Sequence, residues 1–338
     1  MTVLVTGGAG FIGSAFLNLF VPAHPEIQFW NIDKMGYAAN SDSLNEVSGR
    51  ANYHFRKIDI AHSQVLGRAI EAIRPDRVFH FAAESHVDRS VAAPRQFVRS
   101  NVVGTINLLE ACRTYGVERL HHVSTDEVFG SLGDKGEFVE TTPYDPSSPY
   151  SASKAASDHL VRAYARTFGM HVTITNCSNN YGPRQFPEKL IPLMILNAMD
   201  DKPLPVYGNG LNVRDWLYVD DHCRAIWEVA EKGRSGETYC VGGSEERTNL
   251  QIVIAICETL GKNANELVKY VKDRPGHDHR YAVDATKIRE ELGWAPKETF
   301  EEGLKKTVDW YKANPHWVDR VRSGAYRKWI SKQYRGEA

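Results

Sequence analysis

The 338-residue sequence contains few cysteines, and they are not arranged in pairs. The five are scattered along the chain with no Cys-x-x-Cys spacing, at Cys112, Cys177, Cys223, Cys240 and Cys257. An odd and dispersed set argues against a disulfide framework and against a cysteine-based zinc site. We therefore expect a protein of the reducing cytoplasm that holds no metal ion.

The sequence also lacks long apolar runs and an excess of charge of either sign. Its first residues, Met1–Val5, lead directly into a strand pattern, without the basic and apolar stretches of a signal peptide or a membrane anchor. The formal net charge is −1, from 41 Lys and Arg against 42 Asp and Glu. This balance gives no reason to expect nucleic acid or a membrane as a partner, so an acidic ligand must be bound by local groups.

The first half of the chain alternates short apolar segments with helical patterns. We expect strands at residues 3–5, 28–33, 53–60, 77–83, 120–125 and 172–176, and the clearest helices at 101–115 and 150–168. Such alternation is typical of a parallel sheet covered on both faces. Right-handed crossovers then predict a doubly wound, Rossmann-type α/β fold.

The second half is less regular and predicts a smaller, mixed domain. Prolines and glycines cluster over residues 182–210, while 216–219 and 238–241 are expected as strands that return to the main sheet. We assign residues 1–176 plus about 213–241 to an NAD-binding domain. Residues of about 177–212 and 242–338 are assigned to a substrate-binding domain.

A glycine-rich turn joins the first strand to the first helix. Residues 8–13, GAGFIG, fit the pattern G-x-G-x-x-G, and Gly7 precedes them. Glycines let a pyrophosphate approach backbone N–H groups, and the helix N-terminus adds partial positive charge. A turn without a ligand is the alternative, but its place between strand and helix favours a dinucleotide. The contacts are assigned to Gly7, Gly10, Phe11, Ile12 and Gly13.

An acidic residue follows at the distance expected for a ribose contact. Asp33 ends the second strand, 20 residues after Gly13. Its carboxylate can accept hydrogen bonds from a ribose diol and would repel a 2′-phosphate, which favours NAD over NADP. Asp59 and Ile60 are expected near the adenine, with a simple helix cap as the alternative role of Asp59. Room for the cofactor is expected at the fourth strand, beside Ala82, Ala83 and Ser85.

A tyrosine and a lysine lie four residues apart on one predicted helical face. Tyr150 and Lys154 form a Tyr-x-x-x-Lys pattern, which is weak alone because such pairs are common on exposed helices. The ordinary pKa of tyrosine is about 10, and a nearby ammonium with a positive nicotinamide would stabilise the phenolate. After a dinucleotide-binding fold, the pattern predicts Tyr150 as a base and Lys154 as a ligand of the cofactor ribose.

The glycine turn together with Tyr150 and Lys154 resembles the extended short-chain dehydrogenase/reductase family. Five segments are similar to the dTDP-glucose 4,6-dehydratases within it: 82–90 (AAESHVDRS), 124–130 (STDEVFG), 176–183 (NCSNNYGP), 214–221 (RDWLYVDD) and 274–281 (RPGHDHRY). They span nearly the whole chain, and the segment with Asp126 and Glu127 is the most specific. The resemblance implies an NAD-dependent hydro-lyase of a nucleotide-linked hexose, in 6-deoxyhexose synthesis such as that of rhamnose.

The resemblance also implies a role for each residue of an internal redox cycle. Thr125 would hydrogen-bond the hexose O4 while Tyr150 removes its proton and NAD accepts hydride from C4. Glu127 would remove the C5 proton, and Asp126 would protonate the C6 hydroxyl as water leaves. Return of hydride to C6 would give a 4-keto-6-deoxy sugar and regenerate NAD. A solvated turn or a helix cap is the alternative for the two acids.

Asp126 is the residue that best separates this activity from its relatives. Similar epimerases lack the acid pair, similar decarboxylases usually keep only the glutamate, and some GDP-mannose dehydratases carry serine in place of the aspartate. An epimerase or a decarboxylase is therefore the first alternative function. A non-catalytic NAD sensor is the second, although it would not need Tyr150, Lys154 and the acid pair.

The segments similar to the family also supply candidate ligands for the substrate. In a protein of near-zero net charge, local Arg, Lys and N–H groups must meet the two charges of a nucleoside diphosphate. For the substrate we assign Ser85, His86, Thr125, Asn180, Lys189, Tyr207, Arg214, Asn249, Arg274, His277 and Tyr281. For the cofactor we add Lys34, Asn101 and Asn176.

Two further expectations concern histidines and assembly. His122 and five other histidines have no chemical context in the sequence and are assigned structural roles. The resemblance implies a homodimer in which the helices at residues 101–115 and 150–168 pair with their symmetry mates. Apolar patterning does not distinguish this from helices that bury their apolar faces within one chain.

Overall fold

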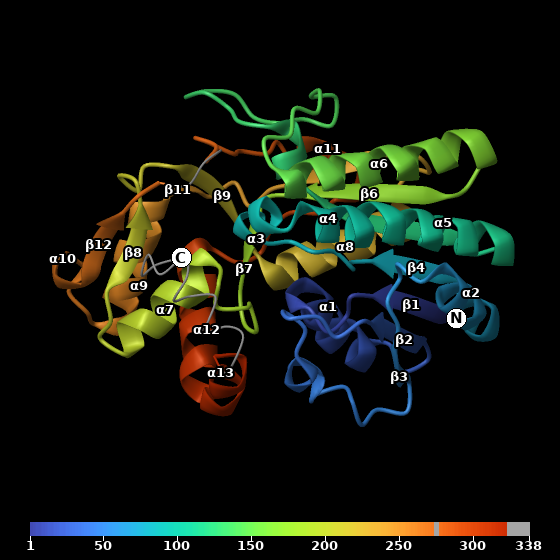
Figure 1. Ribbon diagram of the computed structural model, residues 1–338, viewed down its shortest axis with the longest axis horizontal. Helices are drawn as coiled ribbons and strands as arrows, with labels where there is room; N and C mark the ends of the chain where they lie inside the picture. Colours follow the sequence, from blue (N-terminus) through green and yellow to red (C-terminus); the bar gives the residue numbers. More distant parts are fainter. Residues whose placement is uncertain (274–276, 323–338) are drawn as a thin grey trace.

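A seven-stranded parallel sheet forms the centre of the computed structural model, which describes residues 1–273 and 277–322. The strand order is β10-β6-β5-β4-β1-β2-β3, and every neighbouring pair is parallel. The bounds are β1 Thr2–Thr6, β2 Gln28–Asp33, β3 Tyr53–Lys57, β4 Arg77–His80, β5 Arg119–Thr125, β6 Val172–Cys177 and β10 Thr238–Val241. The predicted Rossmann-type α/β fold is confirmed (Figure 1).

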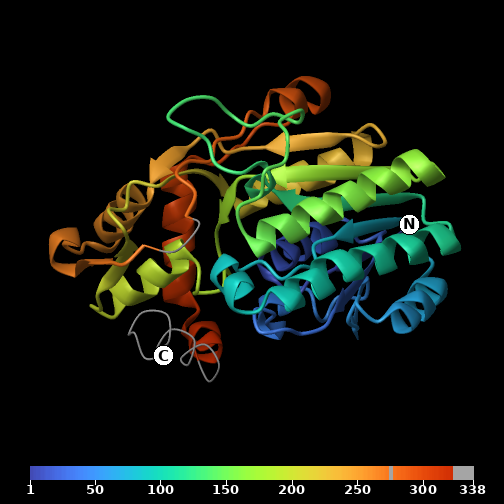
Figure 2. The same ribbon diagram turned by 45° about the horizontal axis from the view of Figure 1, so that its top comes forward.

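Helices cover both faces of this sheet. One face packs against α1 (Phe11–Ala23) and α8 (Val219–Lys232), and the other against α2 (Ser63–Ile73), α5 (Gly104–Tyr115) and α6 (Pro149–Phe168). Because side chains alternate along a strand, Val3 and Val5 join the first core while Leu4 joins the second. Figure 2 shows α5 and α6 side by side on the outer surface.

The helix α6 has clear start and stop signals in its sequence. The Ser148 side chain accepts a hydrogen bond from the Ser151 N–H, and the Ser151 hydroxyl bonds the Ser148 N–H in return. Pro149 occupies the first turn, where its missing N–H costs nothing. Gly169 ends the helix with φ 68°, a left-handed conformation that glycine adopts without strain. These signals place Tyr150 in the first turn, at the carboxyl edge of the sheet.

A smaller unit with its own apolar core lies beside the sheet (Figure 1). It contains a three-stranded sheet of β11 (Glu246–Thr248), β9 (Val213–Tyr218) and β7 (Asn179–Tyr181), and a parallel pair of β8 (Leu204–Tyr207) and β12 (Val268–Val271). Its longer helices are α7 (Leu190–Met199), α9 (Asn249–Leu260), α12 (Phe300–Ala313) and α13 (Pro315–Val321). The shorter segments of the chain are η1 Ser41–Leu44, α3 Val87–Ala92, α4 Pro94–Phe97, η2 Val98–Val103, η3 Asp126–Phe129, α10 Ala264–Leu267 and α11 Thr286–Leu292.

One expected strand does not return to the main sheet. Residues 216–218 belong to β9, which pairs with β7 and β11, and Val219 already starts α8. The outer edge of β6 is taken by β10, so β9 pairs instead with β7, which follows β6 directly. Only residues 238–241 return as expected. The division of the chain into two domains at the boundaries given above stays a prediction.

Candidate active site

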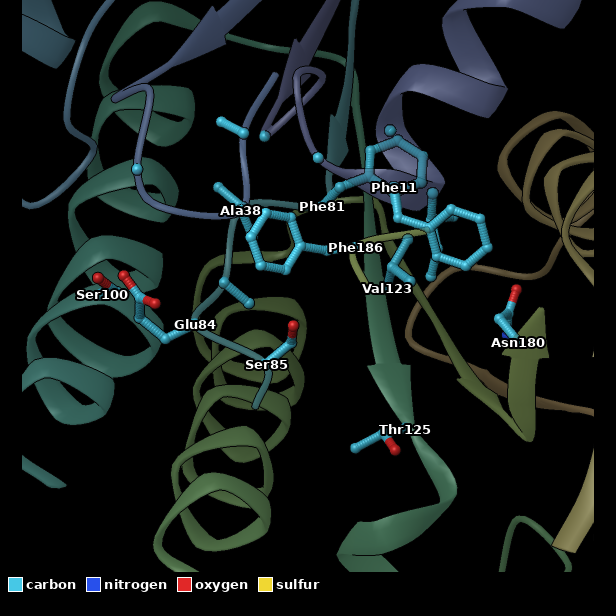
Figure 3. Close-up of a pocket in the computed structure, with 18 of the residues that line it drawn as sticks. Phe11, Ala38, Phe81, Glu84, Ser85, Ser100, Val123, Thr125, Asn180 and Phe186 are labelled. Atoms are coloured by element: carbon cyan, nitrogen blue, oxygen red, sulfur yellow. The ribbon is translucent and has the colours of Figure 1, made fainter. Parts of the chain in front are cut away.

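A cavity of about 290 Å³ opens at the carboxyl ends of the central strands. Figure 3 shows Phe11, Phe81, Val123 and Thr125 around it, with Asn180 entering from the smaller unit. Its lining includes most of the predicted cofactor residues: Gly7, Gly10, Phe11, Ile12, Gly13, Asp33, Lys34, Asp59, Ile60, Ala82, Ala83, Ser85, Tyr150 and Lys154. Thr125, Asp126, Glu127, Asn180 and Lys189 line it as well.

The glycine turn is packed too tightly for side chains. A Cβ on Gly7 would lie 2.6 Å from the Ala82 Cα, and one on Gly13 would lie 2.4 Å from the Gly7 carbonyl oxygen. Gly7 has φ 75°, a conformation that favours glycine. The glycines thus let the backbone of the turn pack closely against residue 82 and against the first turn of α1. This geometry fits the pyrophosphate of a dinucleotide.

Asp33 is bound to the same turn. Its carboxylate accepts hydrogen bonds from the Ala9 N–H at 3.0 Å and from the Met35 N–H at 2.8 Å. Burial raises the pKa of Asp33 above its usual value, and the two N–H donors oppose that rise. Lys34, the next residue, reaches across the cavity wall to Glu84 at 2.5 Å and to the Ser100 hydroxyl at 2.9 Å.

Two residues assigned to the cofactor lie behind the cavity wall rather than on it. Asn101 exchanges hydrogen bonds with the backbone of Glu84, accepting at 2.8 Å and donating at 3.0 Å. The Asn176 amide donates to the Thr125 carbonyl oxygen at 2.9 Å. Neither belongs to the lining, so each holds a lining segment in place.

The predicted catalytic residues meet at one end of the cavity. Thr125 ends β5, and its hydroxyl caps η3 by accepting a hydrogen bond from the Glu127 N–H at 3.2 Å. This turn carries Asp126 and Glu127, and α6 presents Tyr150 and Lys154 to the same space. A helix cap was the alternative role for the two acids. In the structure Thr125 caps the turn, and Asp126 and Glu127 line the cavity.

Asp126 is built to carry a proton. Burial, followed by the charges of Glu127 and Asp215, raises the pKa of Asp126 well above its usual value. Its Oδ1 atom lies 3.3 Å from the Thr125 hydroxyl, while the buried Oδ2 has no hydrogen-bond partner among residues 1–273 and 277–322. A buried carboxyl in this setting keeps its proton to higher pH than an exposed one and can act as an acid.

The pKa of Tyr150 in the structure is shifted in the direction opposite to the one expected. The sequence predicted a lowered pKa through Lys154 and a positive nicotinamide, but burial and the negative charge of Glu127 raise the pKa of Tyr150 well above 10. The Thr125 side chain opposes this rise only in part. The protein groups alone therefore favour the protonated phenol over the phenolate.

The sequence analysis missed a buried pair behind Lys154. The Lys154 Nζ atom lies 3.1 Å from His122 Nε2, which in turn lies 3.2 Å from the Asp158 carboxylate. His122 was assigned only a structural role, and Asp158 was not considered. The available signal was spacing: Tyr150, Lys154 and Asp158 follow one another at intervals of four residues on one helical face.

Candidate substrate ligands nearest the cavity are held by hydrogen bonds of their own. Asn180 Oδ1 lies 2.8 Å from His222 Nδ1, and Lys189 donates to the Ser85 carbonyl oxygen at 2.9 Å. His86 caps α3 and lies 3.6 Å from the carboxylate of Glu188. Polar lining residues that the sequence analysis missed are Tyr37, Glu84, Ser100, Ser124, Ser178, Asn179, Gln185 and Glu188. Most adjoin motifs that it did single out.

Five of the remaining substrate candidates, all within the described residues, lie outside the cavity lining. The Arg214 guanidinium donates to the carbonyl oxygens of residues 213, 278 and 279 and lies 4.3 Å from the Tyr281 ring centroid. Tyr207 and His277 are in edge contact, with ring centroids 6.1 Å apart. Asn249 begins α9, and its N–H donates to the Asn212 carbonyl oxygen at 3.0 Å. Arg274 lies outside the described residues.

These features define a class of protein. A Rossmann-type sheet, a glycine turn at a helix N-terminus and a Tyr-x-x-x-Lys helix facing one cavity make a dinucleotide-dependent enzyme of the short-chain dehydrogenase/reductase type. The model of the family described as GDP-mannose 4,6 dehydratase matches residues 4–307, and the chain belongs to that family.

Several proteins are similar to nearly the full length of this chain, and they bear the same enzyme name. The chain is 52% identical to a dTDP-glucose 4,6-dehydratase of Salmonella typhimurium, over 99% of each chain. The crystal structure of the dTDP-glucose 4,6-dehydratase DesIV from Streptomyces venezuelae, with NAD bound, has a TM-score of 0.91 at 46% identity, over 95% of this chain and 100% of that one. The NAD complex of the Bacillus anthracis dTDP-glucose 4,6-dehydratase has a TM-score of 0.89 at 45% identity, over 95% and 99%.

Proposed function

We propose that the protein is an NAD-dependent hydro-lyase that converts dTDP-glucose into the 4-keto-6-deoxy sugar nucleotide. The observation that carries the proposal is the pairing of the buried Asp126, whose pKa is raised, with Glu127 beside Tyr150. Dehydration needs an acid for the leaving hydroxyl and a base for C5, in addition to the groups that oxidise C4. Full-length relatives that bear the name of this activity support the same conclusion.

The cavity fits the cofactor through its own residues. Gly7, Gly10 and Gly13 keep space at the N-terminus of α1 for the diphosphate, and Asp33 lies where a ribose diol can donate to it. Asp59 and Ile60 border the cavity near the expected adenine position. When bound, NAD supplies a hydride acceptor for the C4 hydrogen and later the donor of that hydride to C6.

Two side chains handle the proton of the C4 hydroxyl. Thr125 holds O4 by a hydrogen bond, and the Tyr150 oxygen accepts the proton as C4 becomes a ketone. Since burial favours the protonated phenol, Tyr150 needs the positive charges of Lys154 and of the bound nicotinamide to ionise. Lys154 thus lowers the cost of a phenolate in a buried site.

The acid pair then removes water. The ketone at C4 acidifies the proton on C5, and Glu127 accepts that proton. Asp126 donates its own proton to the C6 hydroxyl as the C6–O bond breaks. This step needs a protonated Asp126 and an ionised Glu127. The deep burial of Asp126 raises its pKa and so favours this difference between the two carboxyl groups.

The epimerase and decarboxylase alternatives explain less of the site. Both reactions use the cofactor, Tyr150 and Lys154, but neither needs a buried acid at position 126. Asp126 would then be an unexplained buried carboxyl with an unpaired oxygen. An NAD sensor would leave the whole acid end of the cavity without a role.

The partners and the place of action are part of the proposal. Besides the sugar nucleotide, we propose a homodimer that covers the exposed apolar side chains around α5 and α6: Val91, Val98, Val103, Tyr115 and Phe168. The residues at 177–212 and 242–338 are proposed to bind the nucleotide, with Arg214, Tyr207, Asn249, His277 and Tyr281 among its contacts. No nucleic acid or membrane partner is proposed.

A cytoplasmic location fits the state of the cysteines. All five are buried free thiols. None of the helices in the described ranges is both long and apolar enough to cross a bilayer.

Mass spectrometry of the product tests the proposal directly. dTDP-glucose incubated with the purified protein and catalytic NAD is expected to lose one water over many turnovers. Epimerisation would leave the mass unchanged, and decarboxylation needs a substrate with a carboxylate. Loss of no water from dTDP-glucose, with bound NAD verified, would overturn the proposal.

A further inference from the structure

A fully buried polar network lies behind Lys154. The Lys154 ammonium donates to the Val123 carbonyl oxygen at 2.9 Å and lies 3.1 Å from His122 Nε2. The Asp158 carboxylate lies 3.2 Å from the same nitrogen. The side chains of His122 and Asp158 are 1% and 0% exposed, and neither residue lines the cavity. This pair is therefore outside the groups used in the mechanism above.

The charges of the three groups follow from their surroundings. Burial and the charge of Lys154 lower the pKa of His122 to about 4, so its ring is neutral at physiological pH. Burial opposes ionisation of Asp158, yet His122, Lys154 and Ser124 together hold the pKa of Asp158 below its usual value. The buried cation and the buried anion therefore both lie against one nitrogen of a neutral ring.

The shared nitrogen makes a hydrogen bond to Lys154. With the ring proton on Nδ1, the free Nε2 accepts from the Lys154 ammonium. The Asp158 Oδ1 atom lies 3.2 Å from Nε2 but has no hydrogen-bond partner within the described residues. The Nδ1 atom makes no hydrogen bond within the part of the chain that the structure describes. Lys154 and Asp158 therefore meet at Nε2 of the ring.

Asp158 is also the most heavily bonded group of the network. Its Oδ2 atom accepts from the Ser124 hydroxyl at 2.8 Å, from the Tyr144 hydroxyl at 2.9 Å and from the Asn176 amide at 3.3 Å. Asn176 in turn donates to the Thr125 carbonyl oxygen. The carboxylate thus connects Lys154 with the end of β5, where O4 of the sugar would be held.

We propose that Asp158, which contacts the same His122 nitrogen as Lys154, is the buried counter-ion that keeps Lys154 charged and directed toward the cavity. Both are positioning residues for the Tyr150–Lys154 pair, and neither touches substrate or cofactor. Without this anion, an ammonium ion 4% exposed would face only burial, which lowers the pKa of Lys154. The role for Tyr150 rests on the proposed function, but the ionisation of Lys154 does not.

The titratable and charged groups around Lys154 come from every element packed against it. They are His80 on β4, His122 on β5, Tyr150, Asp158 and Arg162 on α6, and Cys177 on β6. Among them only Asp158 is a carboxyl group. Glu127 on η3, the proposed base, lines the same cavity as Lys154. Burial raises the pKa of Cys177 and keeps it a thiol, and burial lowers the pKa of His80 and keeps it neutral.

The test measures Lys154 itself in the NAD-loaded protein. Lysine labelled with carbon-13 at Cε is titrated by NMR, and the Lys154 signal is identified by its loss in Lys154→Met. Asp158→Asn keeps the size of the side chain but removes its charge, so the Lys154 midpoint is expected to fall by roughly one pH unit or more. Without added sugar, the result does not depend on whether dTDP-glucose is the substrate.

A matched control separates charge from packing. Tyr144→Phe removes one hydrogen bond to the same Asp158 oxygen but leaves the carboxylate in place, so the Lys154 midpoint is expected to stay near the wild-type value. An Asp158→Asn protein that is folded and titrates Lys154 as the wild type does would overturn the proposal.

A second pair of variants covers the case in which Asp158→Asn does not fold. His122→Gln keeps a polar group beside the two charges, whereas His122→Leu does not. The Lys154 midpoint is expected to fall further in His122→Leu, and equal midpoints in the two variants would contradict the role of the ring. In turnover assays, the basic limb of the pH profile of kcat is expected to move to lower pH in Asp158→Asn. A merely structural loss would lower the rate equally at every pH.

Discussion

The carboxyl group of Asp126 lies against the hydroxyl of Thr125, with 3.3 Å between Oδ1 and Oγ1. The hydroxyl that would hold O4 of the sugar and the acid that would release the C6 oxygen therefore belong to consecutive residues. Thr125 ends β5, and Asp126 starts the 3-10 turn that follows. The change from strand to turn gives the two side chains their separate directions.

Replacement of the acid is expected to stop dehydration selectively. Asp126→Asn keeps the shape of the side chain but removes its transferable proton, so kcat is expected to fall by about 10²- to 10⁴-fold. Loss of water from dTDP-glucose is followed by mass spectrometry. Asp134→Asn, whose side chain is 95% exposed, is the control and is expected to react as the wild type does. Unchanged turnover in Asp126→Asn would exclude the acid role.

The same variant is expected to be more stable than the wild type at neutral pH. A carboxyl with a raised pKa in the folded state gives stability that is complete below its unfolded pKa and is lost as pH rises through the folded pKa. Asparagine stays neutral throughout. The stability advantage of Asp126→Asn over the wild type is therefore present at pH 7–8 and shrinks toward about pH 4. Thermal unfolding across this range measures it, with a rise in Tm of about 2 °C or more expected at pH 7–8. A lower Tm of the variant at every pH would contradict the burial argument.

The glycine turn predicts a loss of cofactor upon a very small change. In Gly13→Ala the new Cβ would lie 2.4 Å from the Gly7 carbonyl oxygen and 2.8 Å from the Gly8 Cα, so backbone must move. We expect at least a 10-fold weaker affinity for NAD, measured by calorimetry, because the moved backbone closes the diphosphate space. Gly49→Ala adds its Cβ to open space and serves as the control.

Asp33 is expected to set the choice between the two nicotinamide dinucleotides. Asp33→Asn removes the charge that repels a 2′-phosphate but keeps an oxygen for the Ala9 or Met35 N–H. The ratio of NAD to NADP affinity is expected to fall by about 10-fold or more. Asp59→Asn, at the cavity border, provides a comparison with a smaller expected effect. An unaltered ratio in Asp33→Asn would mean that another group discriminates between NAD and NADP at the ribose.

The homodimer predicts that charges on one apolar surface separate the subunits. Val98 and Val103 are 50% and 41% exposed on the segment that leads into α5. The double variant Val98→Asp/Val103→Asp is expected to be a monomer by light scattering at micromolar concentration, because a dimer interface would bury the new charges. Val65→Asp on α2, 51% exposed in the wild type, is the matched control and should stay dimeric. A monomeric wild-type protein would refute the dimer itself.

Local patterns were enough to predict most of the main sheet. The alternation of strand and helix patterns predicted β1 to β6 along the chain, because parallel strands need crossover helices between them. The same reasoning failed at residues 216–219, since a strand pattern does not say which edge the strand joins. That choice depends on β10, which takes the edge of β6 from a later part of the chain.

The site was predictable where chemistry depends on spacing within one segment. The glycine turn and the Tyr150–Lys154 pair are both readable in fewer than eight consecutive residues. Contacts between segments that are distant in the sequence could not be predicted. One example is the hydrogen bond that the Tyr37 hydroxyl donates to Glu188, 151 positions away in the sequence. His122 belongs to the second group, because its role depends on a carboxylate from another element.

The late arrival of β10 affects how the protein can be made. All six residues of β6 are buried, yet the strand that covers its outer edge is supplied only at residues 238–241, after the β7–β9 excursion. A nascent chain that has reached residue 200 would present β6 as a bare edge, which is a site for pairing with other chains. Gene fragments split before residue 238 are therefore expected to yield aggregates rather than an isolated NAD-binding half. Fragments of the first half that carry residues 238–241 on a short linker are expected to remain in solution.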